Sequence, residues 1–281
     1  MHPEATITHW VVLDFEATCD EGEPPDPQEI IEFPSVLLRA DTLETVDEFE
    51  SFVRPSHHPR LTDFCRTLTG IEQADVDAAR PFREVLEAHQ AWLASHGLPL
   101  ETDDGALPYA FITCGDWDFQ TLFPRQLRAT EPAFDYVAQP YRQWVNIKSA
   151  YTEWVPDHRS AGMAHILEVL GLTLEGRHHR GIDDCRNIVK IVRALVARGQ
   201  ELTITGRLPT SRYPQLQVIL CRGGKQERVT LKRRALKTLL GLASSAFRRQ
   251  AKHAHLAPSG QPLLDDDDLL DLRDGTQIAI S

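Results

Sequence analysis

Apolar and polar positions in the first 199 residues predict strands and helices in mixed order. Short apolar runs predict strands at residues 9–15, 33–39, 47–53 and 108–113, with a turn at 41–45. Apolar residues recur at helical spacing in three later stretches, namely 81–95, 160–170 and the segment that follows Asp184 and ends at Gly199. Three strands therefore come before the first long helix. This order predicts an α/β domain with a mixed sheet flanked by helices.

The pattern changes after Gly199. Short strands are predicted at 202–205, 216–220 and 228–231, with Gly223-Gly224-Lys225 as a hairpin turn. A helix from about 234 to 249 and short strands near 260–264 and 275–280 follow. We expect two domains, at residues 1–199 and 200–281, of which the second is a small α+β domain.

Composition narrows the class of protein. The chain has 281 residues, of which 42% are hydrophobic, and no apolar run reaches the roughly 20 residues that cross a bilayer. The first residues do not combine a basic segment with an apolar one, so we expect no secretory signal and a cytoplasmic location. The five cysteines are widely spaced and include no C-x-x-C, which argues against a disulfide framework and a zinc site.

The net charge of −11 opposes long-range attraction to nucleic acid. Part of it is local, because Asp265 to Asp268 form one acidic run. Basic residues gather on and beside the predicted C-terminal helix, at Lys232, Arg233, Arg234, Lys237, Arg248, Arg249 and Lys252. They predict either an RNA or protein partner surface or simply a solvated basic face.

Candidate chemistry begins with Asp14 and Glu16 in Val-Val-Leu-Asp-Phe-Glu-Ala-Thr. Side chains alternate along a strand, so the two carboxylates are predicted to point the same way. Two acids this close repel each other unless a cation lies between them, and magnesium and manganese prefer oxygen ligands. A solvent-facing edge strand could carry the same pair without any metal. The rest of the chain decides between these two interpretations.

Two further segments supply acids and a histidine. Asp118 follows the apolar run 109–112 and lies near a strand end and a helix start. Asp184 is predicted in the first turn of the helix that ends at Gly199, with His179 in the loop before it. A loop histidine at this spacing can approach a metal-bound water while the aspartate stays fixed on the helix. An alternative pairing takes Asp183 as the ligand and His178 as its histidine.

These residues resemble the DEDDh superfamily of 3′-to-5′ exonucleases, in particular its Eri-1-like (3′hExo-like) branch. The acids and His179 match in order and spacing over about residues 8–199. The resemblance also rests on Asp-Phe-Glu-Ala-Thr-Cys at 14–19, Glu-Ile-Ile-Glu-Phe-Pro at 29–34, Phe-Val-Arg-Pro at 52–55, Leu-Thr-Asp-Phe-Cys at 61–65, Leu-Thr-Gly-Ile at 68–71, Trp117-Asp118 and Gly-Ile-Asp-Asp at 181–184. It implies an RNase H-like fold with a mixed five-stranded sheet. More weakly, the region after residue 199 resembles β-grasp modules of the ubiquitin-like or doublecortin-like kind, which serve as interaction domains.

The resemblance also implies a mechanism. Two Mg²⁺ or Mn²⁺ ions roughly 3.5 to 4 Å apart would be held by four acids. Asp14 would bridge both ions, Glu16 and Asp184 would complete one shell, and Asp118 would serve the other. His179 would act as general base, since an imidazole with a pKa near ~6.5 can accept a proton at neutral pH.

Substrate contacts are also implied. Trp117 and Phe64 would sandwich the terminal base, and stacking of this kind is worth ~1–3 kcal/mol. The backbone from Phe15 to Ala17 would hold the terminal sugar, while Thr18, Met163 and His179 would line the pocket. Trp117 and Phe64 could instead be ordinary core aromatics.

We therefore expect a metal-dependent 3′-to-5′ exonuclease that acts on RNA with a free 3′ end and releases nucleoside 5′-monophosphates. A catalytically silent nucleic-acid-binding or scaffold protein is one alternative. An exonuclease that prefers DNA or very short oligonucleotides is another.

Overall fold

The computed structural model describes residues 6–102, 106–134, 137–156, 162–208, 216–231, 236–248, 250–257, 259, 262–263 and 276–281. The chain forms two compact units, Met1–Leu208 and Pro209–Ser281. Each is described by itself below. Within the described residues, no helix has both the length and the apolar composition needed to cross a membrane.

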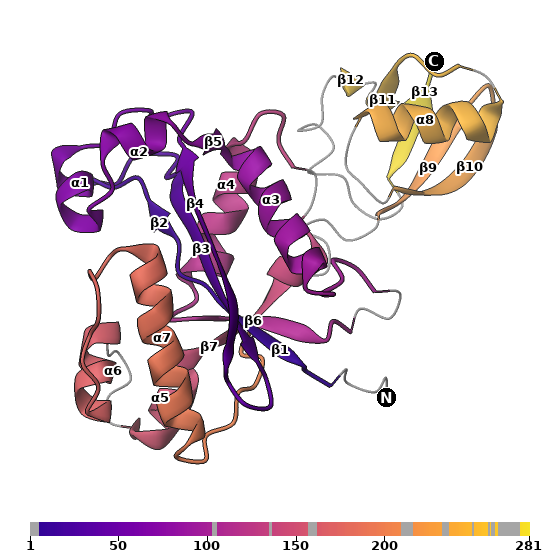
Figure 1. The fold of residues 1–281 in the computed structure, drawn as a ribbon. Helices are drawn as coiled ribbons and strands as arrows, with labels where there is room; N and C mark the ends of the chain where they lie inside the picture. Colours follow the sequence, from indigo (N-terminus) through magenta and orange to yellow (C-terminus); the bar gives the residue numbers. More distant parts are fainter. Residues whose placement is uncertain are drawn as a thin grey trace. The chain divides into compact units, whose positions relative to one another are not determined.

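The first unit is built on a mixed sheet (Figure 1). Its central strand, β1 (His9–Val12), pairs antiparallel with β3 (Ile30–Arg39) and parallel with β6 (Tyr109–Thr113). The sheet continues on one side to β4 (Thr45–Arg54) and on the other to β7 (Gln143–Asn146). These five strands form the mixed five-stranded sheet that the family resemblance implied, although the apolar pattern had not predicted β7. Three two-residue strands extend it, namely β2 (Glu16–Ala17), β5 (Arg80–Pro81) and β8 (Gly206–Arg207).

Helices cover both faces of this sheet, and two apolar clusters hold the layers together. Val11, Phe33 and Phe111 belong to the cluster shared with α3 (Phe82–Ser95) and α4 (Phe123–Ala129). Alternate strand residues belong to the other cluster, which includes residues of three helices: α5 (Ile147–Trp154), α6 (Met163–Leu170) and α7 (Gly181–Val196). Figure 1 shows these two groups of helices on opposite sides of the sheet. Strands buried on both faces explain the continuous apolar runs in the sequence.

Shorter helices connect these layers. Two follow β4, α1 (Asp63–Thr69) and α2 (Gln73–Asp77). The Thr62 side chain accepts from the N–H of Cys65 and caps α1, which ends at Gly70 with φ +73°. Beyond β6 comes a π-helical turn, η1 (Asp118–Leu122), and before β7 a 3₁₀ turn, η2 (Gln139–Arg142).

The predicted first strand, 9–15, is longer than the observed one. β1 ends at Val12, and Glu16 lies in the separate strand β2, which pairs with β3 through an irregular register. Asp14 therefore lies between two strands and not within one. The chain leaves the strand here because the next N–H group, that of Phe15, donates to the Asp118 side chain and not to a neighbouring strand. Alternation along one strand is thus not the reason that Asp14 and Glu16 lie close together.

The second unit contains a five-stranded sheet and one helix. Its strands lie in the order β10-β9-β13-β11-β12, with β13 parallel to β9. The elements are β9 (Leu216–Arg222), β10 (Lys225–Leu231), α8 (Leu236–Phe247), β11 (Ala254–Leu256), β12 (Pro262–Leu263) and β13 (Gln277–Ile280). Gly223 and Gly224, both at positive φ, form the predicted hairpin turn.

In three places near or within this unit, the structure differs from the secondary structure predicted from the sequence or does not describe the residues concerned. Residues 202–205 are not a strand; Leu202 and Ile204 pack on the core of the first unit instead, and the neighbouring β8 pairs with β7. Strand β11 was not predicted. The acidic run at 265–268 and the basic residues at 232–234 and 249 lie outside the described residues, and so does the side chain of Lys237.

Candidate active site

Three acids converge at one end of the central strand. Asp14 follows β1, Glu16 lies in β2, and Asp184 lies in the first turn of α7. One carboxylate oxygen from each lies within 4.8 Å of the other two. Glu16 and Asp184 are 8% and 2% exposed, so their charges are largely withdrawn from water. Residues far apart in sequence therefore form one compact group of oxygen ligands.

The start of α7 is fixed by an acid on the sheet. The Glu32 carboxylate, which is fully buried, accepts the N–H groups of Gly181 (3.0 Å) and Ile182 (3.2 Å) and the Arg180 Nε–H (3.1 Å). It satisfies helix N–H groups that no side chain of the helix itself caps. A Cβ at Gly181 would lie 2.8 Å from the Asp14 carbonyl oxygen, so only glycine lets the helix start this close. Sequence reasoning missed the role of Glu32, although the residue lies within the Glu-Ile-Ile-Glu-Phe-Pro segment.

Asp118 is attached to the same site by the backbone. Its Oδ1 accepts the N–H of Phe15 at 3.0 Å, and Phe15 is the residue between Asp14 and Glu16 in the sequence. Among the described residues, Asp118 is not part of the tight group formed by Asp14, Glu16 and Asp184. It lies on the side where β6 leads into η1 and is 5% exposed.

The electrostatics of the four acids favour a bound cation. Burial, followed by repulsion from Asp118 and Asp184, raises the pKa of Asp14 well above its usual value. Burial and Asp14 raise the pKa of Glu16 to about 11. Burial raises the pKa of Asp118 to about 6, and it also raises the pKa of Asp184. Carboxylates that repel one another and supply only oxygen ligands fit a hard divalent cation, which would let them ionise together.

Two neighbouring histidines contact Asp184 in different ways. The His178 Nδ1 lies 3.2 Å from both carboxylate oxygens, whereas the backbone N–H of His179 donates to Oδ2 at 2.8 Å. Their rings stack with centroids 3.9 Å apart. His179 has φ +67°, a conformation that non-glycine residues adopt rarely. No hydrogen bond to the His179 ring occurs within the described part of the chain, so its ring nitrogens stay available.

The residues expected to bind substrate divide by exposure. Trp117 and Phe64 are 42% and 38% exposed, unusual for such large apolar side chains. They lie just before η1 and on α1, respectively. Both present aromatic surface to solvent, so they are not the ordinary core aromatics that the alternative interpretation of the sequence described.

The other expected contacts are buried. The Phe15 ring stacks on Phe123 within the core, with centroids 5.8 Å apart. Met163, the first residue of α6, packs in the apolar cluster that α6 shares with α5 and α7. Ala17 is 7% exposed. The Thr18 hydroxyl accepts the Glu29 N–H at 2.9 Å. For these residues, side-chain contact with a ligand would require movement, although backbone atoms near them could still take part.

A second residue that sequence reasoning missed is Lys148, in the first turn of α5. Its Nζ lies 4.0 Å from the position that a Cβ would occupy at Gly115, in the turn that leads to Asp118. Lys148 comes two residues after Asn146, the last residue of β7. A cation at this strand end could have been noticed if that strand had been predicted.

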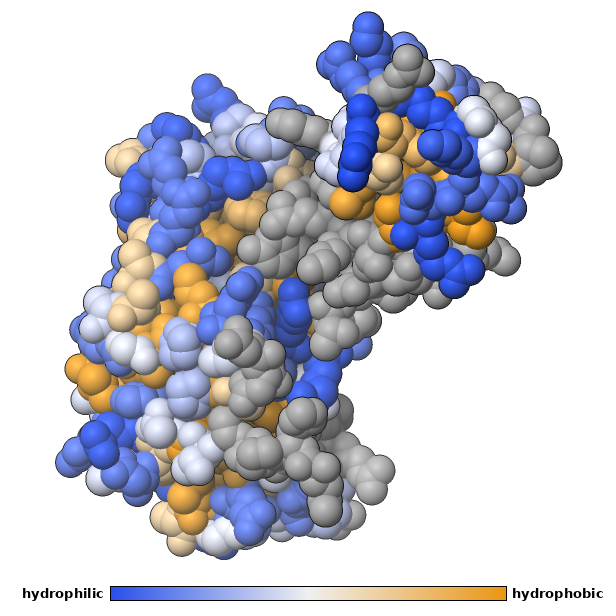
Figure 2. All heavy atoms as spheres, turned by 90° about the vertical axis from the view of Figure 1, so that its right-hand side faces the viewer, coloured by the Kyte–Doolittle hydropathy of each residue, from blue (hydrophilic) through white to orange (hydrophobic). Residues whose placement is uncertain are grey.

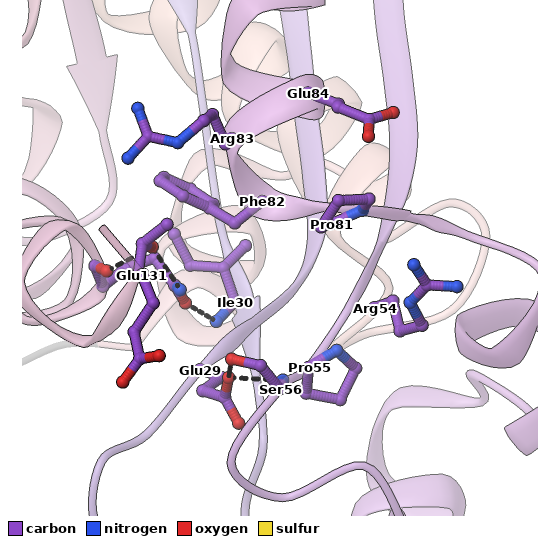
Figure 3. Close-up of a pocket in the computed structure, with 12 residues that line it drawn as sticks. Glu29, Ile30, Arg54, Pro55, Ser56, Pro81, Phe82, Arg83, Glu84 and Glu131 are labelled. Atoms are coloured by element: carbon purple, nitrogen blue, oxygen red, sulfur yellow. Dashed lines mark hydrogen bonds between the residues drawn. The ribbon is translucent and has the colours of Figure 1, made fainter. Parts of the chain in front are cut away.

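A separate pocket of about 210 Å³ lies elsewhere on this unit (Figure 3). Its lining includes Glu29, Ser56 and Gln126 but none of the candidate residues named above. The Glu29 carboxylate accepts the N–H groups of Ser56 (2.6 Å), His57 (2.9 Å) and His58 (2.8 Å), and Gln126 accepts from Ile30 (2.6 Å). Glu29 thus holds the loop after β4 and Gln126 holds the start of β3, which indicates a structural role for both.

Comparisons with known proteins agree with this geometry. Residues 11–192 match the model of the exonuclease family RNase_T. The chain is 41% identical over 198 residues to human ERI1 exoribonuclease 3 and 37% identical over 199 residues to human 3′-5′ exoribonuclease 1, in each case over 70% of this chain. It spans about half the length of these relatives, 56% and 55%.

Solved structures give the same result. The nuclease domain of 3′hExo, a DEDDh family member solved bound to rAMP, is 35% identical with a TM-score of 0.64, over 73% of this chain and all of that one. A 3′-exonuclease solved for its recognition of the histone mRNA stem-loop is 32% identical with a TM-score of 0.65, over 80% of this chain and 92% of that one. The predicted RNase H-like fold and the family resemblance are thereby confirmed.

Proposed function

Because this chain belongs to the exonuclease family RNase_T, we propose that it is a metal-dependent 3′-to-5′ exonuclease that removes terminal nucleotides from RNA. The observation that carries the proposal is the convergence of Asp14, Glu16 and Asp184, with Asp118 and His179 beside them. A protein that only bound nucleic acid would gain nothing from acids that repel one another in a buried site. The names of the relatives support RNA as substrate.

The acid group fits divalent cations, and we assign Mg²⁺ or Mn²⁺ to it. Asp14, Glu16 and Asp184 would hold one ion, and Asp14 and Asp118 would serve a second. When bound, two such ions stabilise charge on the attacking and leaving oxygens of an in-line displacement. Glu32 contributes indirectly, because it fixes the helix that carries Asp184.

His179 is proposed as the general base. Its ring is free of hydrogen bonds within the described residues, while its backbone is anchored on Asp184. Burial and the adjacent His178 lower the pKa of His179. The imidazole is therefore neutral at physiological pH and can take a proton from the attacking water. His178 is less suited to this role because its Nδ1 is already engaged by Asp184.

Trp117 and Phe64 are proposed to hold the terminal nucleotide. Their exposed rings can stack on any base, which suits an enzyme that removes successive nucleotides regardless of sequence. Asp118 directly follows Trp117, so the stacking surface is tied to the site of hydrolysis.

The proposal is tested with RNA and DNA oligomers that have free or phosphate-blocked 3′ ends, in magnesium, manganese or EDTA. We expect stepwise loss of 3′ nucleotides that requires metal and a free end, and that is faster on RNA. Asp14→Asn should lower the rate on the order of 10³-fold, because charge stabilisation of several kcal/mol is lost. Asp41→Asn is the matched control, since the Asp41 carboxylate pairs with the exposed Arg39 and with no other cation in the described part of the chain.

A second readout is thermal. A metal present at about 100 times its Kd should stabilise the native protein by about 2.7 kcal/mol, and this shift should vanish in Asp14→Asn. RNA binding without degradation under either metal would favour a catalytically silent binder. Faster degradation of DNA would reverse the assigned sugar preference.

We propose that the C-terminal part, expected from about residue 200 onward, is an interaction domain. On the face of the second unit seen in Figure 2, hydrophobic side chains are visible between hydrophilic ones, and apolar surface of this kind can bind a partner. Its sheet supplies no cluster of candidate catalytic residues within the described part. Crosslinking of the full chain in an extract, compared with a chain that ends at residue 208, tests this role.

We further propose a cytoplasmic location. All five cysteines are free thiols, as is usual in a reducing compartment. Fractionation of cells that express a tagged chain tests this placement, and recovery from the secreted fraction would contradict it.

A further inference from the structure

Lys148 brings a positive charge to the edge of the acid group. It lies at the second position of α5, half-buried, and its Nζ is 4.0 Å from the Cβ position of Gly115. Gly115 belongs to the turn between β6 and η1, which also carries Trp117 and leads directly to Asp118, the first residue of η1. No ion pair within 4.0 Å and no side-chain hydrogen bond involves this ammonium group among the residues described.

The position is costly for a lysine. A cation in the first turn of a helix faces the positive end of the helix dipole and is disfavoured there. Half-burial removes part of its hydration, and the nearby Asp14 and Asp118 carboxylates act on the ammonium group only through space, without a direct ion pair among the described residues. The placement makes physical sense if an anion occupies the space beside it during function.

The charges around Asp14 are arranged on two sides. Burial raises the pKa of Asp14 and of Asp118, and Lys148 opposes the rise at both. Burial also raises the pKa of Asp184, and there His178 and His179 oppose it. The contacts show the same arrangement: His178 and the His179 backbone contact the Asp184 carboxylate, whereas the Lys148 Nζ lies beside the turn that leads to Asp118.

In-line displacement at phosphorus places the attacking and leaving oxygens on opposite sides of the phosphoryl group. His179, which takes the proton of the attacking water, marks one side. We propose that Lys148 is a further catalytic residue that lies on the other side and stabilises the charge that develops on the leaving 3′ oxygen. This inference rests on the proposed exonuclease function.

The step balances without any further reactant. The bond from the water oxygen to phosphorus forms, the bond from phosphorus to the 3′ oxygen breaks, and the electron pair of the broken bond stays on that oxygen. The water proton passes to the His179 imidazole. The leaving oxygen finally takes a proton from solvent, while the Lys148 ammonium remains protonated and acts through its charge.

The test compares two leaving groups. One substrate is an RNA oligomer, which releases a 3′ alkoxide, and the other is the 5′-p-nitrophenyl ester of UMP, whose phenolate needs little stabilisation. The variants are Lys148→Gln, which removes the charge, and Lys148→Arg, which keeps it. Lys190→Gln is the matched control, because Lys190 lies on α7 and pairs with Glu175 on the surface. Thermal melting checks that each variant is folded.

We expect Lys148→Gln to lose on the order of 10²-fold in kcat on RNA, the typical effect of removing one charge-stabilising donor, but less than about 10-fold on the ester. Lys148→Arg should stay within about 10-fold of the native protein, and Lys190→Gln should match it. An equal loss on both substrates, or no loss on RNA, would overturn the assignment to the leaving oxygen. If the native protein cleaved neither substrate, the result would instead contradict the proposed exonuclease function itself.

Discussion

Three acids of the site are buried and Asp14 is partly buried, at a cost that a bound cation would offset. Glu16 shows this most clearly, since it is 8% exposed and faces Asp14 and Asp184. Removing an ionised carboxylate from water is unfavourable unless opposite charge or hydrogen bonds replace the lost hydration. We therefore infer that the metal-free site is a locally destabilised part of an otherwise well-packed unit.

The pH dependence of stability tests this inference. The pKa of Glu16 is raised from 4.5 to about 11, so the folded protein keeps a proton that the unfolded chain has released. Unfolding then releases a proton, and the contribution of Glu16 to stability falls as pH rises above about 4.5. In EDTA, Glu16→Gln should gain stability relative to the native protein between pH 5 and 8, by at most about 1.4 kcal/mol per pH unit. Chemical denaturation at several pH values measures this, and a constant difference would contradict it.

At the scale of elements, the site depends on how α7 is attached to the sheet. Glu32 of β3 caps the helix through Gly181 and Ile182, and the helix carries Asp184. Arg180 extends the connection, because its guanidinium bonds to both Glu32 and the exposed Glu50. One buried carboxylate thus positions a whole helix relative to Asp14, which follows β1, and to Glu16 of β2.

Replacing Glu32 tests whether it positions α7. Glu50 is the matched control, because it pairs with the same arginine, Arg180. Glu32→Gln should cost about 2–3 kcal/mol of unfolding free energy, because a charged acceptor of buried N–H groups is lost. Glu50→Gln should cost less than about 1 kcal/mol, since its pair is partly exposed. Urea denaturation of both variants gives the comparison. Equal effects would show that Glu32 acts only as another partner of Arg180.

At the scale of the whole molecule, the two units have separate cores. The apolar cluster of the second unit contains residues from Val218 to Ile280 and none from the first. Every candidate site residue lies before residue 208. The first unit should therefore fold and act without the second.

Truncation tests where the first unit ends. A chain of residues 1–208 should melt cooperatively and keep the exonuclease rate within about threefold, because core and site are complete. A chain of residues 1–199 should melt at least several degrees lower, because it lacks β8, which pairs with β7, and loses Leu202 and Ile204 from the core. Equal melting temperatures would place the end of the folded unit near residue 199.

Much of the architecture was predictable from local sequence. The helices at 81–95 and before Gly199 and the strands around 33–39, 47–53 and 108–113 follow from apolar spacing that burial on the sheet requires. The candidate acids were recognisable because carboxylates after buried strands are costly without a role.

What remained hidden depends on contacts between distant residues. By itself, the sequence predicted the longer helices and strands and the candidate acids, since these follow from residue type and short-range spacing, but it did not predict β7, α5 or β11. Only the tertiary structure decided that Glu32 caps a helix 149 residues further on, that Lys148 lies beside the turn of Asp118, and that β1 ends before Asp14. These outcomes depend on packing and on long-range hydrogen bonds, which no periodicity along the chain records.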